Sequence, residues 1–149
     1  MNVAVAFDHR GVALREAIME ALRGHDVVDL GTHDASVRVD YPDKAQQVGD
    51  AILSGAAERG VLVCGSGAGA AIAACKMTGI RAAICHDIYS AHQAVEHDDM
   101  NVLCLGSEII GASVARELVE VFLAAKFDGG DRYVARLAKV AAMEKGLRG

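Results

Sequence analysis

A glycine-rich stretch, CGSGAG at residues 64–69, places a thiol beside a backbone suited to binding an anion. It follows an apolar run at residues 60–64 and precedes an alanine-rich segment of helical composition at residues 68–77. Glycines at the start of a helix let backbone N–H groups approach a negatively charged oxygen, and the helix dipole adds to the attraction. The same amides stabilise a thiolate, so Cys64 is a candidate base or nucleophile. A tight turn with a buried cysteine is the alternative interpretation.

A second pair of candidates, Asp8 and His9, follows the apolar run at residues 3–7. A carboxylate can orient sugar hydroxyls, and an imidazole can bind an anion or move a proton near neutral pH. Asp8 could instead cap the following helix, with His9 as a solvated side chain. No nucleotide-binding fingerprint is present, because the glycines follow the third apolar run rather than the first and no Gly-Lys-Ser/Thr follows them.

Two further polar sets lie in the second half of the chain. His97 and Asp98 end a segment of helical period at residues 89–98, where a histidine can interact with the helix dipole. Arg132 and Arg136 are one helical turn apart in the last helical segment, residues 132–145, and could clamp a phosphate. An i,i+4 basic pair is otherwise a solvated helix face. The remaining cysteines, at positions 75, 85 and 104, are interpreted as core residues.

The scaffold for these residues is predicted by five short apolar runs, at residues 3–7, 26–30, 60–64, 81–85 and 102–105. The runs are continuous rather than alternating, which is typical of parallel strands covered on both faces. Segments of helical period alternate with them, and this alternation predicts a doubly wound, three-layer α/β/α fold with right-handed crossovers. We expect a five-stranded parallel sheet in the order 2-1-3-4-5 and an extra C-terminal helix.

Ligands of such sheets bind beyond the carboxyl ends of the strands, where the strand order reverses. In the expected order this point lies between the first and third strands, which end in Asp8-His9 and in the glycine loop. His86 follows the fourth run and could line the same edge. His97 falls at the opposite end of the sheet, so it can reach the site only from another subunit. The last helix has no strand to return to, and we expect it to pack on a neighbouring subunit.

Composition excludes several other classes of protein. The 149 residues predict one domain, residues 1–149, and 15 basic against 20 acidic side chains argue against non-specific nucleic-acid binding. No stretch approaches the roughly 20 apolar residues that cross a bilayer, and no secretory signal is present. The four cysteines lack CxxC or metal-ligand spacing, which favours a reduced, cytoplasmic environment. We therefore expect no nucleic-acid or membrane partner.

Six blocks occur in order between residue 8 and about residue 130: DHRG, GTH…DYPD, VLVCGSGAG, AACKMTGIRAA, HDIYSA and EHDDMNVLCLG. Together they resemble the type B ribose-5-phosphate isomerase family, which includes galactose-6-phosphate isomerase subunits. The resemblance implies a Rossmann-like fold, a homodimer or tetramer with sites shared between subunits, and no metal or other cofactor. The implied reaction is aldose–ketose isomerisation through a cis-enediolate, with ribose 5-phosphate and ribulose 5-phosphate as the expected pair.

The resemblance also implies a role for each matching residue. Cys64 is the implied base, because Ala70 and Ala71 stand in the helix where another branch of the family uses a Glu. His97 would assist opening of the furanose ring, and Ser66 would bond a substrate oxygen. The backbone of residues 65–69 would hold the enediolate oxygen. Substrate contacts are implied for Asp8, His9, Gly65, Gly67, Ala68, Gly69, Arg132 and Arg136.

Three positions depart from the family pattern. Glu108 stands where the family has a phosphate-binding arginine, and a carboxylate there would repel a phosphate dianion. Arg10 stands where the family often has a small residue, and it is our candidate to restore the positive charge at the substrate. Asp98 replaces a frequent asparagine and is kept as a substrate-binding candidate. Another sugar phosphate, or an unphosphorylated aldose such as allose or ribose, is therefore the alternative substrate.

Two functions of a different class are weighed against an isomerase. A phospho-receiver signalling domain would share the strand order and Asp8, but it needs an Asp after the third strand and a Lys after the fifth. This chain has Cys64 and Gly106-Ser107 there. A non-catalytic nucleotide-binding module would bind ATP or NAD, and the position of the glycine loop disfavours it.

Overall fold

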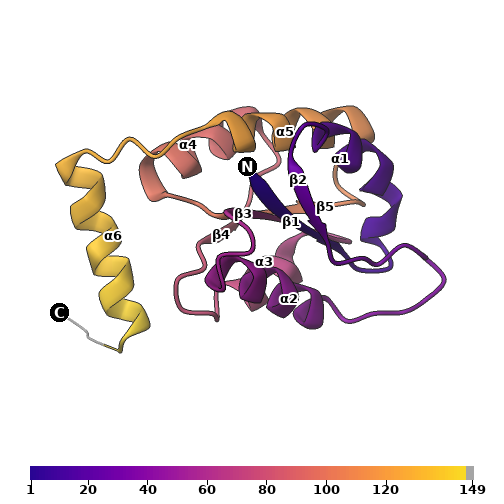
Figure 1. Cartoon of the computed structure of the whole chain (residues 1–149), viewed down its shortest axis with the longest axis horizontal. Coiled ribbons are helices and arrows are strands. Elements are labelled where there is room, and N and C mark those ends of the chain that lie inside the picture. The colour runs from indigo at the N-terminus through magenta and orange to yellow at the C-terminus, as the bar shows by residue number, and fades with distance from the viewer. Residues whose placement is uncertain (147–149) are drawn as a thin grey trace.

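The computed structural model describes residues 1–146, in which helices cover both faces of a parallel sheet (Figure 1). Its strands are β1 (Asn2–Phe7), β2 (Asp26–Asp29), β3 (Arg59–Cys64), β4 (Ala82–Ile84) and β5 (Val102–Gly106). Its helices are the 3-10 turn η1 (Gly11–Leu14), α1 (Arg15–Ala21), α2 (Tyr41–Leu53), α3 (Ala68–Ala74), α4 (Ile88–Asp98), α5 (Ala112–Ala124) and α6 (Asp131–Glu144). The predicted three-layer α/β class is confirmed. No helix within residues 1–146 is long and apolar enough to cross a membrane.

The strand order is β2-β1-β3-β5-β4, so the expected order 2-1-3-4-5 is wrong at its last two positions. β5 is buried along its whole length, as suits an interior strand, and Leu62 of β3 lies opposite Cys104 of β5. β4 has only three residues, and Ile84 is 40% exposed, as suits an edge strand. The expectation failed because it assumed that consecutive strands are neighbours, which holds for only about two-thirds of them. The reversal of strand order between β1 and β3 is unaffected.

The two faces of the sheet are filled by side chains of different size. Alternate residues of a strand point to opposite faces. Val3, Val5 and Phe7 of β1 pack in one cluster with the helices α1, α4 and α5. Ala4 and Ala6 face α2 and α3, in a second cluster that contains Cys64 and several alanines of those helices. The candidate thiol therefore belongs to the face lined by small residues, below the sheet in Figure 1.

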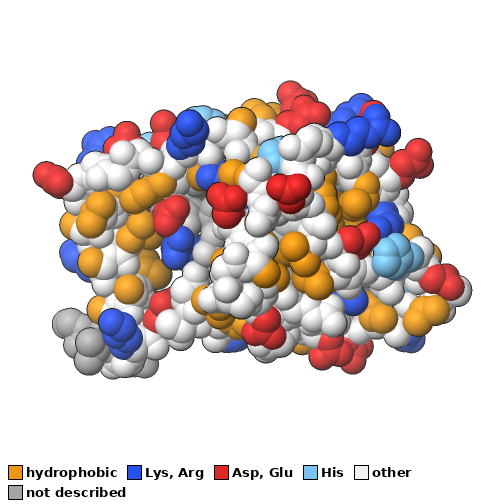
Figure 2. Space-filling model, in the orientation of Figure 1, with side chains coloured by type: hydrophobic (Ala, Val, Ile, Leu, Met, Phe, Trp, Pro, Cys, Tyr) orange, Lys and Arg blue, Asp and Glu red, His pale blue; other side chains and the backbone are white. Residues whose placement is uncertain are grey.

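The helix α6 stands apart from these layers and packs against α4 (Figure 1). Its buried residue within the described chain is Tyr133, whereas Val134, Val140 and Met143 are exposed. Figure 2 shows hydrophobic side chains over this helix, at the left of the view. The expected packing of α6 on a neighbouring subunit remains a prediction.

The helix α1 is preceded by the tight turn η1. The backbone of Gly11 in this turn lies so close to Val63 that a Cβ would be 2.2 Å from the Val63 carbonyl oxygen. The helix predicted at residues 68–77 ends earlier, at Ala74. Neither feature moves the strand ends that carry the candidate site.

Candidate active site

A pocket of about 310 Å³ opens at the carboxyl ends of β1 and β3. Three segments line it: the turn after β1, the loop that leads into α2, and the glycine loop after β3. The lining residues are Asp8, His9, Arg10, Arg38, Val39, Asp40, Tyr41, Cys64, Gly65, Ser66 and Gly69. The two candidate groups that the sequence placed at the reversal of strand order therefore share one pocket.

Cys64 is the last residue of β3 and is only 4% exposed. Its Sγ accepts a hydrogen bond from the backbone N–H of Gly67 at 3.2 Å. Gly67 adopts a positive φ of 81° before α3, and this conformation favours glycine. A donor aimed at sulfur stabilises negative charge on it. Ser66 lines the same pocket, and its hydroxyl accepts a hydrogen bond from the Ala68 N–H at 3.2 Å.

Gly69 makes room for Tyr41, whose phenol ring packs on the first turn of α3. A Cβ at Gly69 would lie 2.7 Å from the Cζ of Tyr41. Tyr41 is half-exposed and lines the pocket. Neither Tyr41 nor Arg38 was singled out as a site residue, although DYPD belongs to one of the blocks that carry the family resemblance. The available signal was the proline of Tyr41-Pro42, which brings the first turn of α2 to a defined position.

Asp8 and His9 each have a structural partner as well as a place in the pocket. The buried Asp8 accepts a hydrogen bond from the Gly11 N–H at 2.8 Å, although the N-cap residue of η1 is Arg10. The Nδ1 of His9 lies 3.2 Å from the carbonyl oxygen of Val39 and 3.4 Å from the Val39 nitrogen. Its Nε2 forms no hydrogen bond with any residue of the described chain. His9 therefore ties the loop before α2 to the end of β1.

Arg10 lies between the pocket and Glu108. Its Nη1 is 3.5 Å from Oε2 of Glu108, and both side chains are more than half exposed. Arg10 lines the pocket, whereas Glu108 is not among the lining residues. The Ser107 hydroxyl donates to the Arg10 carbonyl oxygen at 2.9 Å and holds the two turns together. The carboxylate of Glu108 is thus partly offset by a guanidinium.

His86 does not line the pocket but contacts the end of β5 next to it. Its Nε2 accepts a hydrogen bond from the Gly106 N–H at 2.9 Å, at the end of β5. Burial lowers the pKa of His86, which favours the neutral ring that can accept this bond. Gly106 in turn packs on Ser66, since a Cβ there would be 2.6 Å from the Ser66 carbonyl carbon.

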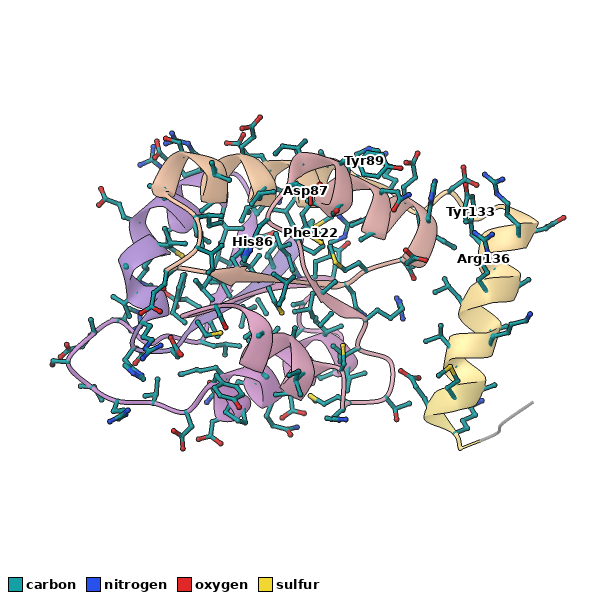
Figure 3. The ribbon with its side chains drawn as sticks, turned by 180° about the vertical axis from the view of Figure 1, so that it is seen from behind. His86, Asp87, Tyr89, Phe122, Tyr133 and Arg136 are labelled. Carbon is teal, nitrogen blue, oxygen red and sulfur yellow. The ribbon has the colours of Figure 1, made fainter. Side chains whose placement is uncertain are left out.

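The remaining candidates, His97, Asp98, Arg132 and Arg136, lie at α4 and α6 and do not line the pocket. The ring of His97 stacks on Tyr133 with 4.4 Å between centroids. The Arg132 guanidinium lies over the same ring at 4.6 Å. Figure 3 shows Tyr133 and Arg136 on α6, well separated from His86 at the sheet. One chain therefore brings together Cys64 and Asp8 but not the histidine and arginines of the second set.

The structure shows no candidate metal site within the residues it describes. Among residues 1–146, no group of three or more His, Cys, Asp and Glu side chains is arranged to hold a metal ion. The expected independence from metals remains a prediction.

Comparison with known proteins identifies the family. The family model described as Ribose/Galactose Isomerase matches residues 3–140. Ribose-5-phosphate isomerase B of Escherichia coli is 41% identical over 146 residues, which are 97% of this chain and 97% of that protein. D-erythrulose-4-phosphate isomerase 2 of Mycolicibacterium smegmatis is 33% identical over 148 residues, with 97% of each chain covered. The solved structure of Clostridium thermocellum ribose-5-phosphate isomerase B superposes with a TM-score of 0.93 and 41% identity, over 99% of this chain and 100% of that chain.

These matches span nearly the whole chain. Membership of this family argues against the phospho-receiver and nucleotide-binding alternatives. The chain belongs to the ribose/galactose isomerase family and is an aldose–ketose isomerase.

Proposed function

We propose that this enzyme interconverts ribose 5-phosphate and ribulose 5-phosphate, with Cys64 as the base. The observation that carries the proposal is the Cys64 sulfur, which receives the Gly67 N–H at 3.2 Å and lines the same pocket as Asp8, His9 and Ser66. The hydrogen on C2 of an open-chain aldose is weakly acidic because it is next to the carbonyl group. Its removal requires a base and hydrogen-bond donors at the carbonyl oxygen.

The pocket contains a base and hydrogen-bond donors for the transfer of a proton between C2 and C1. The Cys64 thiolate takes the C2 proton, the C–H electron pair forms a C1–C2 double bond, and the carbonyl pair moves to O1. The backbone N–H groups of residues 65–69 and the Ser66 hydroxyl hold the resulting enediolate oxygen. The Cys64 thiol then returns the proton to C1, while the O2 proton is transferred to O1. The product is the ketose, with no net oxidation and no cofactor.

We also propose that a second copy of the chain completes the site as a homodimer or larger assembly. His97, Asp98, Arg132 and Arg136 are the groups that this copy would supply, for ring opening and phosphate binding. The apolar side chains of Leu137 and Val140 line two grooves of about 360 and 390 Å³ between α6 and the rest of the chain. Burial of these grooves would stabilise the assembly through the hydrophobic effect.

Arg10 is proposed to neutralise Glu108, so that the carboxylate does not repel the substrate phosphate. The support is the 3.5 Å separation of Arg10 Nη1 and Glu108 Oε2 at the rim of the pocket. An exposed pair of this kind contributes little to folding stability, so its value would lie in the potential at the pocket.

The first test is turnover of ribose 5-phosphate by the wild type and by Cys64→Ala, without added metal. We expect the substitution to lower kcat by about a hundred- to ten-thousandfold, because the base is lost. Cys85→Ala is the matched control, since Cys85 is also buried but does not line the pocket. Wild-type turnover by Cys64→Ala would contradict the assignment of the base.

A different sugar is the second candidate, and the carboxylate of Glu108 at the rim favours it. The relative from Mycolicibacterium smegmatis is named for D-erythrulose 4-phosphate. Measuring kcat/KM for ribose 5-phosphate, D-erythrulose 4-phosphate, free ribose and free allose separates the cases. Turnover confined to the free sugars would retain the isomerase chemistry and reject the phosphorylated substrate.

A further inference from the structure

We propose that Arg38 binds the phosphate group of the substrate from within the same chain and thereby selects phosphorylated over free sugars. This inference rests on the proposed function, because it assigns the anion of the same substrate to a named side chain. Arg38 belongs to none of the sequence motifs described above. The folded chain nevertheless places it in the lining of the candidate pocket.

The first argument is where the backbone places Arg38. It belongs to the loop between β2 and α2, and it lines the pocket that also contains Asp8, His9 and Cys64. The next residue, Val39, contacts Nδ1 of His9 through both its carbonyl oxygen and its nitrogen, at 3.2 and 3.4 Å. The backbone beside Arg38 is therefore fastened to the end of β1, and the exposed side chain of Arg38 lines the pocket.

The second argument is charge. Arg10 and Arg38 are the arginines that line the pocket, and Arg10 lies 3.5 Å from Glu108. Arg38 forms no ion pair and no hydrogen bond with any residue in the part of the chain that the structure describes. Asp8 and Asp40 line the pocket as well, but neither forms an ion pair with the Arg38 guanidinium in the described chain.

Another cation close to Arg38 is already engaged. Arg38 lines an adjoining pocket of about 460 Å³ with Asp40, Asp43, Lys44 and Gln47. The Nζ of Lys44 donates to the Leu30 carbonyl oxygen at 2.7 Å and to Gln47 at 3.2 Å. Lys44 therefore fixes the start of the loop, and Arg38 is the cation that this chain would add to the Arg132 and Arg136 proposed for the second copy.

The third argument is the chemistry of the two groups. A guanidinium presents a planar fork of N–H donors that matches two oxygens of a phosphate, and the hydrogen bonds are strengthened by charge. A free sugar has no anion for this fork. Arg38 is therefore expected to stabilise the bound phosphate ester and its transition state equally, which lowers KM without raising kcat.

The test compares Arg38→Ala and Arg38→Lys with the wild type on ribose 5-phosphate and on free ribose. We expect Arg38→Ala to raise KM for ribose 5-phosphate about tenfold, with kcat changed by less than about twofold. Arg38→Lys should recover part of the loss, since it keeps the charge but not the planar fork. Turnover of free ribose should not respond. Arg23→Ala is the matched control, because Arg23 is exposed at the end of α1, outside the pocket.

A binding measurement separates this inference from the proposed function. Inorganic phosphate is titrated calorimetrically into the wild type, Arg38→Ala and Arg23→Ala. Weaker phosphate binding by Arg38→Ala alone supports the role of Arg38, even if ribose 5-phosphate turns out not to be the substrate. Equal phosphate binding by all three proteins, or an equal rise of KM for free ribose and ribose 5-phosphate, overturns the inference while leaving the isomerase proposal intact.

Discussion

The environment of Cys64 differs from that of the other buried cysteines in one hydrogen bond. Burial, with a further contribution from the Asp87 carboxylate, raises the pKa of Cys85 to about 11. Burial, followed by the neighbouring thiols, raises the pKa of Cys104 well above its usual value of 9.0. Within residues 1–146, neither sulfur accepts a backbone N–H, whereas Cys64 accepts the Gly67 N–H. This donor distinguishes the proposed base from thiols that serve only as core side chains.

The packing of Gly69 on Tyr41 can be tested with one added methyl group. In Gly69→Ala, the new Cβ would lie 2.7–2.9 Å from three ring atoms of Tyr41, so the ring must shift within the pocket. We expect kcat/KM to fall about ten- to hundredfold, as for other small displacements of site residues. Gly111→Ala is the control, because a Cβ there meets nothing within 4 Å. Steady-state kinetics and thermal unfolding of both variants would show the effect, and an unchanged kcat/KM for Gly69→Ala would contradict it.

The residues of the pocket were not equally accessible to sequence analysis. Cys64, Asp8 and His9 follow apolar runs directly, so strand periodicity and the reversal of strand order placed them at one edge. Tyr41 and Arg38 enter the pocket through the path of the loop at residues 30–40, which carries no periodic pattern. That path is set by tertiary contacts such as Val39 with His9, which a single sequence does not specify.

At the scale of elements, the interior position of β5 shapes the glycine loop. Because β5 lies next to β3, the Ser107 N–H donates to the Cys64 carbonyl oxygen and the Glu108 N–H donates to that of Gly65, both at 2.9 Å. In the expected order, β4 and His86 would have occupied this position. Both apolar runs are short, and propensity alone could not decide which one lies inside. The number and direction of the strands were predictable, but their lateral order depended on burial.

Asp29, in the edge strand β2, leads to a prediction about how folding stability depends on pH. Burial raises the pKa of Asp29, but hydrogen bonds from Arg15, the Gly31 N–H and His33, together with the charge of Arg15, lower it from 3.8 to about 2. A lowered pKa stabilises the folded state above the unfolded-state value and loses this effect as the pH falls towards the folded-state value. Asp29→Asn should therefore cost about 1 kcal/mol of unfolding free energy at neutral pH, because solvent screens a charge pair near the surface. The difference in unfolding free energy between Asp29→Asn and the wild type should shrink below pH 3.8 and vanish near pH 2.

Urea unfolding at a series of pH values measures this difference. Asp26→Asn is the control at the other end of β2, where the Asp26 side chain is exposed and forms no ion pair with any residue of the described range. A wild-type advantage over Asp29→Asn that stays constant down to pH 2 would refute the role assigned to the Asp29–Arg15 pair.

For the whole molecule, the separation of Cys64 from His97 leads to a subunit-mixing experiment. Cys64→Ala and His97→Ala are expected to be inactive alone, since each assembly lacks one group at every site. In mixed dimers, one site carries both substitutions and the other carries none. Random exchange should therefore restore about a quarter of wild-type activity. A mixture of Cys64→Ala with Cys64→Ser should restore nothing. Failure of the first mixture, after exchange has been verified by mass, would contradict a site shared between copies.

The unequal filling of the two sheet faces bears on how the enzyme can be altered. On the face towards α2 and α3, Ala4 and Ala6 are fully buried, and Cys64 belongs to the same cluster. A larger side chain there would push α3 outward and carry the glycine loop with it. Val5, Phe7 and Phe122 lie on the opposite face of the sheet, which is built from large side chains that can be repacked. The two faces should thus tolerate substitution differently. Substitutions on the face of α1, α4 and α5 should change mainly stability, whereas those on the face of α2 and α3 should lower activity.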